Sequence, residues 1–202
     1  MAKQALLVVD VQNDFCPGGA LPVPGGDEVV PVLNRYIELF VKTGLPVFAT
    51  RDWHPQKTRH FALYGGTWPV HCVQDTPGAA FHPDLQLPTD VTIVSKGMDP
   101  NEDCYSCFEG FVQVGTLFLD LLRRTGIQEL FIGGLATDYC VKFTALDARK
   151  HGVEIRVLSD AIRGVDLKPG DVETALREME FAGARFVTYD EASKQFSRSG
   201  RR

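Results

Sequence analysis

Three residues that could together break an amide bond each follow an apolar run in the sequence. They are Asp10, Lys96 and Cys140. Continuous apolar runs are typical of strands buried in a parallel sheet, and ligands bind beyond the carboxyl ends of such strands. We therefore expect the three side chains to meet in one cleft. There Asp10 could accept the thiol proton of Cys140 and return it to a leaving amine, while Lys96 holds the carboxylate and stabilises a thiolate.

Cys140 lies in a segment, residues 133–141, that is expected to join a buried strand to a helix. We predict that Thr137 and Asp138 cap the first turn of this helix. Cys140 would then lie beside free N–H groups and the positive end of the helix dipole, which favour the thiolate. A lone cysteine here would more simply be a core residue. The two charged residues named above favour a nucleophile instead.

A second group combines one carboxylate with several imidazoles. Asp52 and His54 follow the predicted strand 46–50, and His60 and His71 lie in the long loop beyond it. Such side chains suit Zn, Mn or Fe bound with positions left open for water or substrate. Their spacing is looser than that of a zinc finger, so a polar loop with backbone-bonded histidines is the alternative.

The cysteines indicate a reducing compartment. The chain has 5 of them, an odd number in a chain too large to need disulfides for stability, so we expect a cytoplasmic protein. Cys104 and Cys107 form a C-x-x-C pair. We assign that pair no role, because no second pair accompanies it and the thioredoxin-like context is missing.

Composition excludes several classes of protein. The chain has 202 residues, 44% hydrophobic and 23% charged, with a net charge of −5, which is ordinary for a globular protein and argues against general nucleic-acid binding. No stretch approaches the roughly 20 apolar residues that span a bilayer, and the start of the chain lacks signal-peptide features. We expect neither a nucleic-acid nor a membrane partner.

Strands and helices are expected to alternate along the whole length, which predicts an α/β fold with a mostly parallel sheet and helices on both faces. We expect one domain over residues 1–202 and a flexible tail at 195–202. Two long loops, 55–88 and 98–109, lack periodicity, and loops of this length are usually functional. The expected strands are 5–10, 46–50, 91–95, 129–132, 154–158 and 185–187, and the expected helices are 27–42, 116–124, 140–148 and 171–181.

Five motifs, in this order along nearly the whole chain, resemble the nicotinamidases of the isochorismatase-like hydrolase superfamily. That resemblance implies a six-stranded, largely parallel sheet and hydrolysis of nicotinamide to nicotinic acid and ammonia in NAD salvage. The nicotinamidases that the chain resembles are of the pyrazinamidase type, but the sequence does not fix whether this chain acts on pyrazinamide-like analogues. The motifs are VDVQNDF at 9–15, RDWH at 51–54, WPVHC at 68–72, SKG at 95–97 and GLATDYCV at 134–141.

The resemblance implies a role for each group of residues. The catalytic triad would be Asp10, Lys96 and Cys140. One divalent metal ion would be held by Asp52, His54 and His71, and His60 matches a position that ligates metal in some members only. A cis peptide would fall at Leu135–Ala136 and aim the backbone N–H groups of Ala136 and Cys140 at an oxyanion. The walls of the pyridine site would be Phe15, Trp68 and Tyr105.

Two alternatives stay open. A related amidohydrolase acting on carbamoyl or ureido groups would use the same triad without needing the Asp52, His54 and His71 cluster. A non-enzymatic metal-binding protein of this fold would leave the triad without a purpose. An isochorismatase proper does not use a cysteine nucleophile, so Cys140 argues against it. The sequence leaves the metal's identity and a homo-oligomer open.

Overall fold

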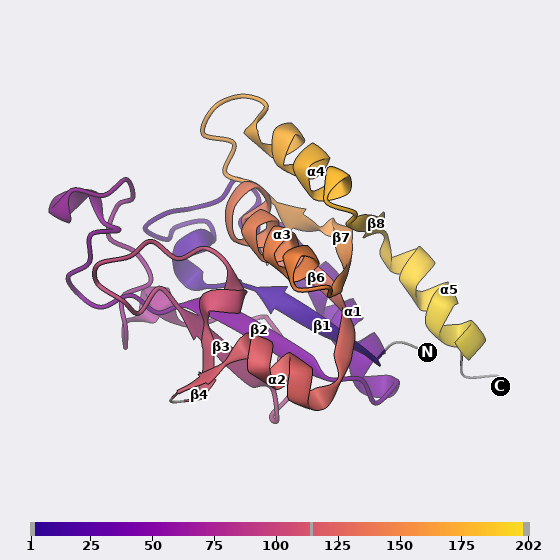
Figure 1. Ribbon diagram of the computed structural model, residues 1–202. Helices are drawn as coiled ribbons and strands as arrows, with labels where there is room; N and C mark the ends of the chain where they lie inside the picture. Colours follow the sequence, from indigo (N-terminus) through magenta and orange to yellow (C-terminus); the bar gives the residue numbers. More distant parts are fainter. Residues whose placement is uncertain (1–2, 114, 200–202) are drawn as a thin grey trace.

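A central sheet of eight strands organises the part of the chain that the computed structural model describes, residues 3–113 and 115–199 (Figure 1). The strand order is β5-β4-β3-β2-β1-β6-β7-β8. Six of the strands run parallel, which confirms the predicted α/β architecture. They are β1 (Lys3–Val9), β2 (Val47–Asp52), β3 (Thr92–Lys96), β6 (Ile127–Leu135), β7 (Glu154–Arg163) and β8 (Arg185–Val187).

The other two strands extend one edge of the sheet and correct the expected count of six. β4 (Phe111–Gln113) pairs antiparallel with β3, and β5 (Thr116–Leu117) pairs antiparallel with β4. Both strands are too short to show an alternating pattern in the sequence. β5 also takes the first residues of the predicted helix 116–124, so α2 begins at Phe118.

The described residues form five α-helices beside the sheet, and the last of them was not predicted. α5 includes residues 195–199 of the segment that was expected to be a flexible tail; residues 200–202 lie outside the described part. The helix is held because the Phe196 ring packs 5.0 Å from Phe40 and 5.6 Å from Phe131 between ring centres. The helices are α1 (Val29–Lys42), α2 (Phe118–Thr125), α3 (Lys142–Lys150), α4 (Asp171–Phe181) and α5 (Tyr189–Ser199).

The two faces of the sheet carry separate apolar cores. Successive side chains of β1 point to opposite faces, so Leu6 packs towards α1 and α5 while Leu7 packs towards α2, α3 and α4. This arrangement explains why β1 reads as an uninterrupted apolar run, since both of its faces are covered by helices (Figure 1).

The chain direction around β1 creates the site for a ligand. β1 lies between β2, which leads to β3, and β6, which leads to β7. At such a reversal of strand order, the loops beyond the carboxyl ends separate and leave a crevice. The strand register brings the ends level: Val9 pairs with Gly134, and Asp52 pairs with Lys96. The predicted site residues therefore lie together at the carboxyl ends of the strands.

Gly134 makes this close approach possible, and we expect its replacement by alanine to destabilise the fold by about 2–4 kcal/mol. Its φ is 126°, and a Cβ there would lie 2.0 Å from the carbonyl oxygen of Val9 on the neighbouring strand. Urea unfolding would measure the loss. Gly126→Ala is the matched control, because its φ of 70° is also positive but a Cβ would meet nothing within 4 Å. Equal losses in the two variants would contradict the steric argument.

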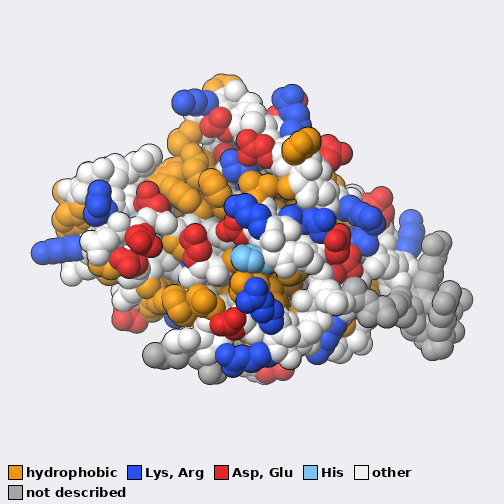
Figure 2. Space-filling model, in the orientation of Figure 1, with side chains coloured by type: hydrophobic (Ala, Val, Ile, Leu, Met, Phe, Trp, Pro, Cys, Tyr) orange, Lys and Arg blue, Asp and Glu red, His pale blue; other side chains and the backbone are white. Residues whose placement is uncertain are grey.

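Within residues 3–113 and 115–199, no helix has the length and apolar character needed to cross a bilayer. The face in Figure 2 mixes basic and acidic side chains, without a broad field of one sign.

Candidate active site

The structure brings Asp10, Lys96 and Cys140 into contact at the carboxyl edge of the sheet. The Lys96 ammonium lies 2.9 Å from Asp10 Oδ2 and donates a hydrogen bond to Cys140 Sγ at 3.3 Å. All three residues are buried, with at most 6% of their surface exposed. A thiol, a carboxylate and a fixed cation thus share one site shielded from bulk water, which is the set of groups that nucleophilic acyl transfer requires.

Asp10 is aimed by its backbone and by Thr50. It follows β1 with a φ of 48°, a region that residues other than glycine seldom adopt. The Thr50 hydroxyl donates to Asp10 Oδ1 at 2.6 Å, and the Thr50 carbonyl accepts the Asp10 N–H at 3.3 Å. With Oδ1 held in this way, Oδ2 faces Lys96 and is the oxygen free to exchange a proton.

Burial sets the protonation states of the three groups. It raises the pKa of Cys140 well above its ordinary value, against the lowering effect of Lys96. Burial also raises the pKa of Asp10, and the charge of Asp52 adds to this. Burial alone would lower the pKa of Lys96, but the two carboxylates raise it well above its ordinary value. The resting site therefore pairs a neutral thiol with a fixed ammonium.

The expected side-chain caps are absent from the turn that holds Cys140, and burial disfavours the thiolate that they were expected to favour. Cys140 lies in a π-helical turn, Thr137–Val141, that precedes α3. The Asp138 carboxylate does not cap this turn; it accepts the N–H groups of Val165 and Asp166 at 2.9 and 2.8 Å. Without those caps, burial outweighs the helix dipole. The thiol must then lose its proton to a base as it attacks, and Asp10 is the neighbouring carboxylate.

The histidines of the second predicted group surround one point next to Asp52. The ligating atoms of His54, His60 and His71 all lie within 4.8 Å of one another. Asp52 adjoins them, with its Oδ2 3.7 Å from His54 Nε2, while its Oδ1 is paired with Lys96. His60, which the sequence left as the least certain member, stacks on His54 with ring centres 4.7 Å apart. Lys96 therefore connects this cluster directly to Asp10 and Cys140.

Hydrogen bonds orient each imidazole so that Nε2 can bind a metal. The Nδ1 atoms of His54 and His71 lie 2.9 and 2.7 Å from the carbonyl oxygens of Gly97 and Pro69. Nδ1 must carry the proton in such a pair, which leaves a lone pair on Nε2. His54 Nε2 is buried and has no hydrogen-bond partner in the described residues. An orphaned acceptor among three imidazoles and a carboxylate fits a divalent cation.

Two imidazoles of the cluster, those of His60 and His71, favour the neutral form. Burial lowers the pKa of His60, and it lowers that of His71 to about 4. Burial alone would raise the pKa of Asp52, but Lys96 and the neighbouring histidines hold it below its ordinary value. Neutral imidazoles and an ionised carboxylate are the forms that ligate metals.

A small cavity of about 30 Å³ lies beside Cys140. The predicted wall residues Phe15, Trp68 and Tyr105 all line it, and the Trp68 indole N–H donates to the Tyr105 hydroxyl at 2.9 Å. Ala136 also lines it, and the Leu135–Ala136 peptide is cis, where the family resemblance placed such a bond. The cavity is therefore walled by aromatic and aliphatic side chains, and Cys140, Asp52, His60 and His71 also line it.

Further lining residues were missed by the sequence analysis. Tyr139 packs edge-on against Trp68 with ring centres 4.8 Å apart, and its position next to Cys140 was the only available signal. Val165 reaches the cavity because Asp138 anchors its backbone, and no local pattern reveals that contact. The remaining wall residues come from the irregular segment after Phe15: Leu21 and Val23.

Two supporting residues were also missed, although both belong to the motif that contains Asp10. The Gln12 side chain donates to the Asp52 carbonyl and accepts from the Asp52 N–H, each at 2.8 Å. The Asp14 carboxylate accepts the N–H groups of Cys72 at 2.7 Å and of Ala20 at 3.1 Å. These contacts fix the backbone beside Asp52 and His71, two members of the group that could hold a metal ion.

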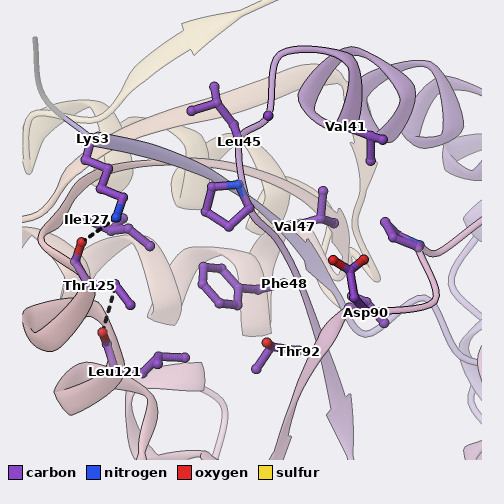
Figure 3. Close-up of a pocket in the computed structure, with 14 residues that line it drawn as sticks. Lys3, Val41, Leu45, Val47, Phe48, Asp90, Thr92, Leu121, Thr125 and Ile127 are labelled. Carbon is purple, nitrogen blue, oxygen red and sulfur yellow. Dashed lines mark hydrogen bonds between the residues drawn. The ribbon is translucent and has the colours of Figure 1, made fainter.

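A larger hollow, of about 520 Å³, lies at the opposite end of the strands (Figure 3). Phe48 and Ile127 point into it, and at its margin Lys3 donates a hydrogen bond to the Thr125 carbonyl at 2.8 Å. It contains none of the nucleophilic or imidazole groups described above. Size alone therefore does not identify the reactive site, which is the smaller cavity at Cys140.

Comparison with known proteins adds independent information. The Isochorismatase domain family matches residues 4–191. A nicotinamidase of Escherichia coli (strain K12) is 43% identical over 204 residues, covering 93% of this chain and 96% of that protein. A nicotinamidase/pyrazinamidase of Mycobacterium tuberculosis is 40% identical, covering 91% of this chain and 98% of the other.

A solved structure is similar over the same length. The pyrazinamidase of Pyrococcus horikoshii, in complex with zinc, superposes with a TM-score of 0.85 at 49% identity. The match covers 93% of this chain and 99% of that one. Sequence and structure comparisons therefore agree over nearly the entire chain.

Proposed function

The chain belongs to the isochorismatase family, and within it we propose a nicotinamidase that hydrolyses nicotinamide to nicotinic acid and ammonia as a single catalytic domain. The similarity to nicotinamidases over more than 90% of the chain supports this activity. The observation that carries the proposal is the contact of Lys96 with both Asp10 and Cys140, next to the Asp52 and histidine cluster. We place the enzyme in the cytoplasm, in NAD salvage.

The reaction starts with attack on the amide. Cys140 gives its thiol proton to Asp10 Oδ2 as its sulfur forms a bond with the carboxamide carbon, and the carbonyl electron pair moves to oxygen. The neighbouring Lys96 ammonium keeps the developing charges paired without changing its own protonation state. We assign stabilisation of the oxyanion to the backbone N–H groups of Ala136 and Cys140, an effect typically worth about 10²–10³ in rate per donor.

Collapse of this intermediate breaks the carbon–nitrogen bond. Asp10 returns the proton to the nitrogen, so that ammonia leaves and a thioester remains on Cys140. Water then attacks the thioester carbon while Asp10 takes one of its protons. The carbon–sulfur bond breaks, the sulfur regains a proton from Asp10, and nicotinic acid is released. Asp10 thus serves as base and acid in turn, which its raised pKa favours.

Asp52, His54, His60 and His71 are the residues that would hold a divalent metal ion beside this site. Zinc, manganese and iron all suit one carboxylate and three imidazoles. Bound there, the metal would supply a Lewis acid that orients the pyridine and withdraws electron density from it. The zinc in the Pyrococcus horikoshii pyrazinamidase makes zinc the first ion to test.

The aromatic walls explain how a flat ring would be selected. Phe15, Trp68 and Tyr105 line the cavity, and we propose that they flank the pyridine. Its volume of about 30 Å³ is far below the roughly 300–1,000 Å³ of typical small-molecule sites. We therefore propose that the walls move apart to admit nicotinamide, and that this movement changes the hydrogen bond between Trp68 and Tyr105, two of the lining residues.

Ammonia release from nicotinamide by the purified protein tests the function directly. We expect release that falls when a chelator removes the metal and returns when zinc, manganese or iron is added back. Release that ignores the chelator would keep the cysteine hydrolase but remove the metal's role, which favours the carbamoyl-type relatives. No release from metal-loaded protein would overturn the nicotinamidase proposal and leave a metal-binding protein of this fold.

A further inference from the structure

His60 is oriented differently from the other two histidines of the cluster. Its Nδ1 lies 2.6 Å from Oδ1 of Asp103, a side chain, whereas His54 and His71 use backbone carbonyls. Asp103 itself has 63% of its side chain exposed, while His60 is buried. The position of one imidazole therefore depends on a residue that comes from a separate segment of the chain.

A carboxylate at this place has a definite effect on the imidazole. It accepts the Nδ1 proton, fixes the ring's orientation and leaves the lone pair on Nε2, which makes the ring a stronger ligand. The His60 ring centre then lies 4.7 Å from that of His54 and 5.5 Å from that of His71. Without Asp103, nothing else described bonds to His60 Nδ1, and the ring would be free to turn.

We propose that Asp103 is a positioning residue that makes His60 a metal ligand, so that the site has four protein ligands and its affinity depends on Asp103. The inference rests on the metal site of the proposed nicotinamidase. It concerns the strength of metal binding, however, and that can be measured without any turnover.

The segment that carries Asp103 gives this contact a further consequence. Residues 98–109 are tied to the histidine-bearing loop at two other points. The Pro100 carbonyl accepts the backbone N–H of Arg59 at 2.8 Å. The Tyr105 hydroxyl accepts the indole N–H of Trp68 at 2.9 Å. Metal on His60 therefore favours the docked segment, and the docked segment favours metal, because a coupling between two events acts equally in both directions.

A simpler role for Asp103 would be a surface ion pair that anchors the loop. Exposed pairs contribute about 0–1 kcal/mol to stability, and a role of that kind would not depend on whether position 60 can bind metal. The two roles differ in one measurable respect. A positioning residue that acts through His60 loses its effect on metal affinity once His60 is removed.

Zinc affinity of the full chain, measured by competition with a chromophoric chelator, tests the proposal. We expect Asp103→Ala to weaken zinc binding about 10- to 100-fold and His60→Ala to weaken it at least as much. The double variant should bind zinc no more weakly than His60→Ala alone. Asp103→Asn, which keeps an acceptor but loses the charge, should fall between wild type and Asp103→Ala.

Glu102→Ala is the matched control. Glu102 is the exposed neighbour of Asp103 and carries the same charge, but it makes no hydrogen bond or ion pair with a described residue. We expect its zinc affinity to stay within twofold of wild type. Circular dichroism of each metal-free variant checks that it folds.

Two results would overturn the proposal. One is a zinc affinity of Asp103→Ala equal to that of Glu102→Ala. The other is that Asp103→Ala weakens zinc binding as much in the His60→Ala variant as it does in the wild type. Both results would leave nicotinamide hydrolysis untouched, because ammonia release by the wild-type protein is a separate measurement. A wild-type protein that binds no divalent cation would refute the positioning role together with the metal site.

Discussion

Cys140→Ala is expected to reduce ammonia release from nicotinamide to the background rate while the protein stays folded. Removing the nucleophile of an acyl-transfer enzyme costs on the order of 10⁶ in kcat, since the remaining groups cannot form the covalent intermediate. The fold should tolerate the change, because only one sulfur atom is removed from an apolar cavity. A coupled assay for ammonia and a thermal melt measure the two effects.

The Cys140→Ser variant separates the nucleophile from the shape of the site. A serine hydroxyl occupies the same place but is far less acidic than a thiol, so Asp10 would have to remove a much less available proton. We expect it to fold and bind zinc as the wild type does, with turnover still close to background. Wild-type-like turnover in the alanine variant would refute the thioester mechanism altogether.

The convergence of Asp10 and Cys140 could be predicted because it follows from two local signals. Each residue comes after a run of apolar residues, and parallel strands end at a common edge. Lys96 ends β3, two strands away from β1, yet its long side chain spans that distance to Asp10. Strand type, direction and side-chain length were therefore enough to anticipate this part of the site.

The state of Cys140 could not be predicted in the same way, because it depends on competition between distant groups. Sequence suggested capping by Asp138, whose carboxylate instead accepts N–H groups of the segment after β7. Burial raises the pKa of Cys140, whereas an exposed helix start would favour the thiolate. A pairing between residues 27 positions apart leaves no trace in local periodicity.

Irregular segments account for the other differences. β4 is three residues long and lies in a stretch without a pattern, and α5 begins in a polar segment whose buried Phe196 gave too little apolar signal. The same limit applies to Asp103, which reaches His60 across 43 residues of chain. Contacts between loops depend on the whole fold. The contact that orients His60 through Asp103 could therefore be found only in the structure.

Lys96→Met is expected to abolish turnover and also to destabilise the metal-free protein by about 3–5 kcal/mol at neutral pH. Lys96 lies between two buried carboxylates, Asp10 and Asp52, and pairs with both. Without the cation two buried carboxyl groups face each other, and they cannot both stay ionised. Asp10 would then hold a proton at neutral pH and could not accept one from Cys140. Ammonia release and urea unfolding measure the two effects.

The pH dependence of that destabilisation follows from the sign of the pKa changes. In the wild type the pKa of Asp52 lies below its ordinary value, so its ion pair contributes stability above the unfolded pKa of about 3.9 and loses it as the pH falls further. In Lys96→Met the pKa values of Asp10 and Asp52 would both lie above those of the unfolded chain. The fold would then lose stability as the pH rises from the unfolded pKa towards those raised values. The stability difference from wild type should therefore be largest near pH 7 and shrink towards pH 4.

Adding Asp10→Asn to Lys96→Met distinguishes charge from packing. In Lys96→Met one of the two facing carboxyl groups has to take up a proton on folding at pH 7, which costs stability. The amide needs no proton, so the double variant should recover part of the lost stability at pH 7 without recovering any turnover. If charge is the cause, this recovery should be absent near pH 4, where the carboxylates are protonated in both variants. A stability loss that did not change with pH and did not respond to Asp10→Asn would mean that Lys96 contributes by filling space. Its place as the cation shared by the cysteine site and the metal-binding cluster would then have to be abandoned.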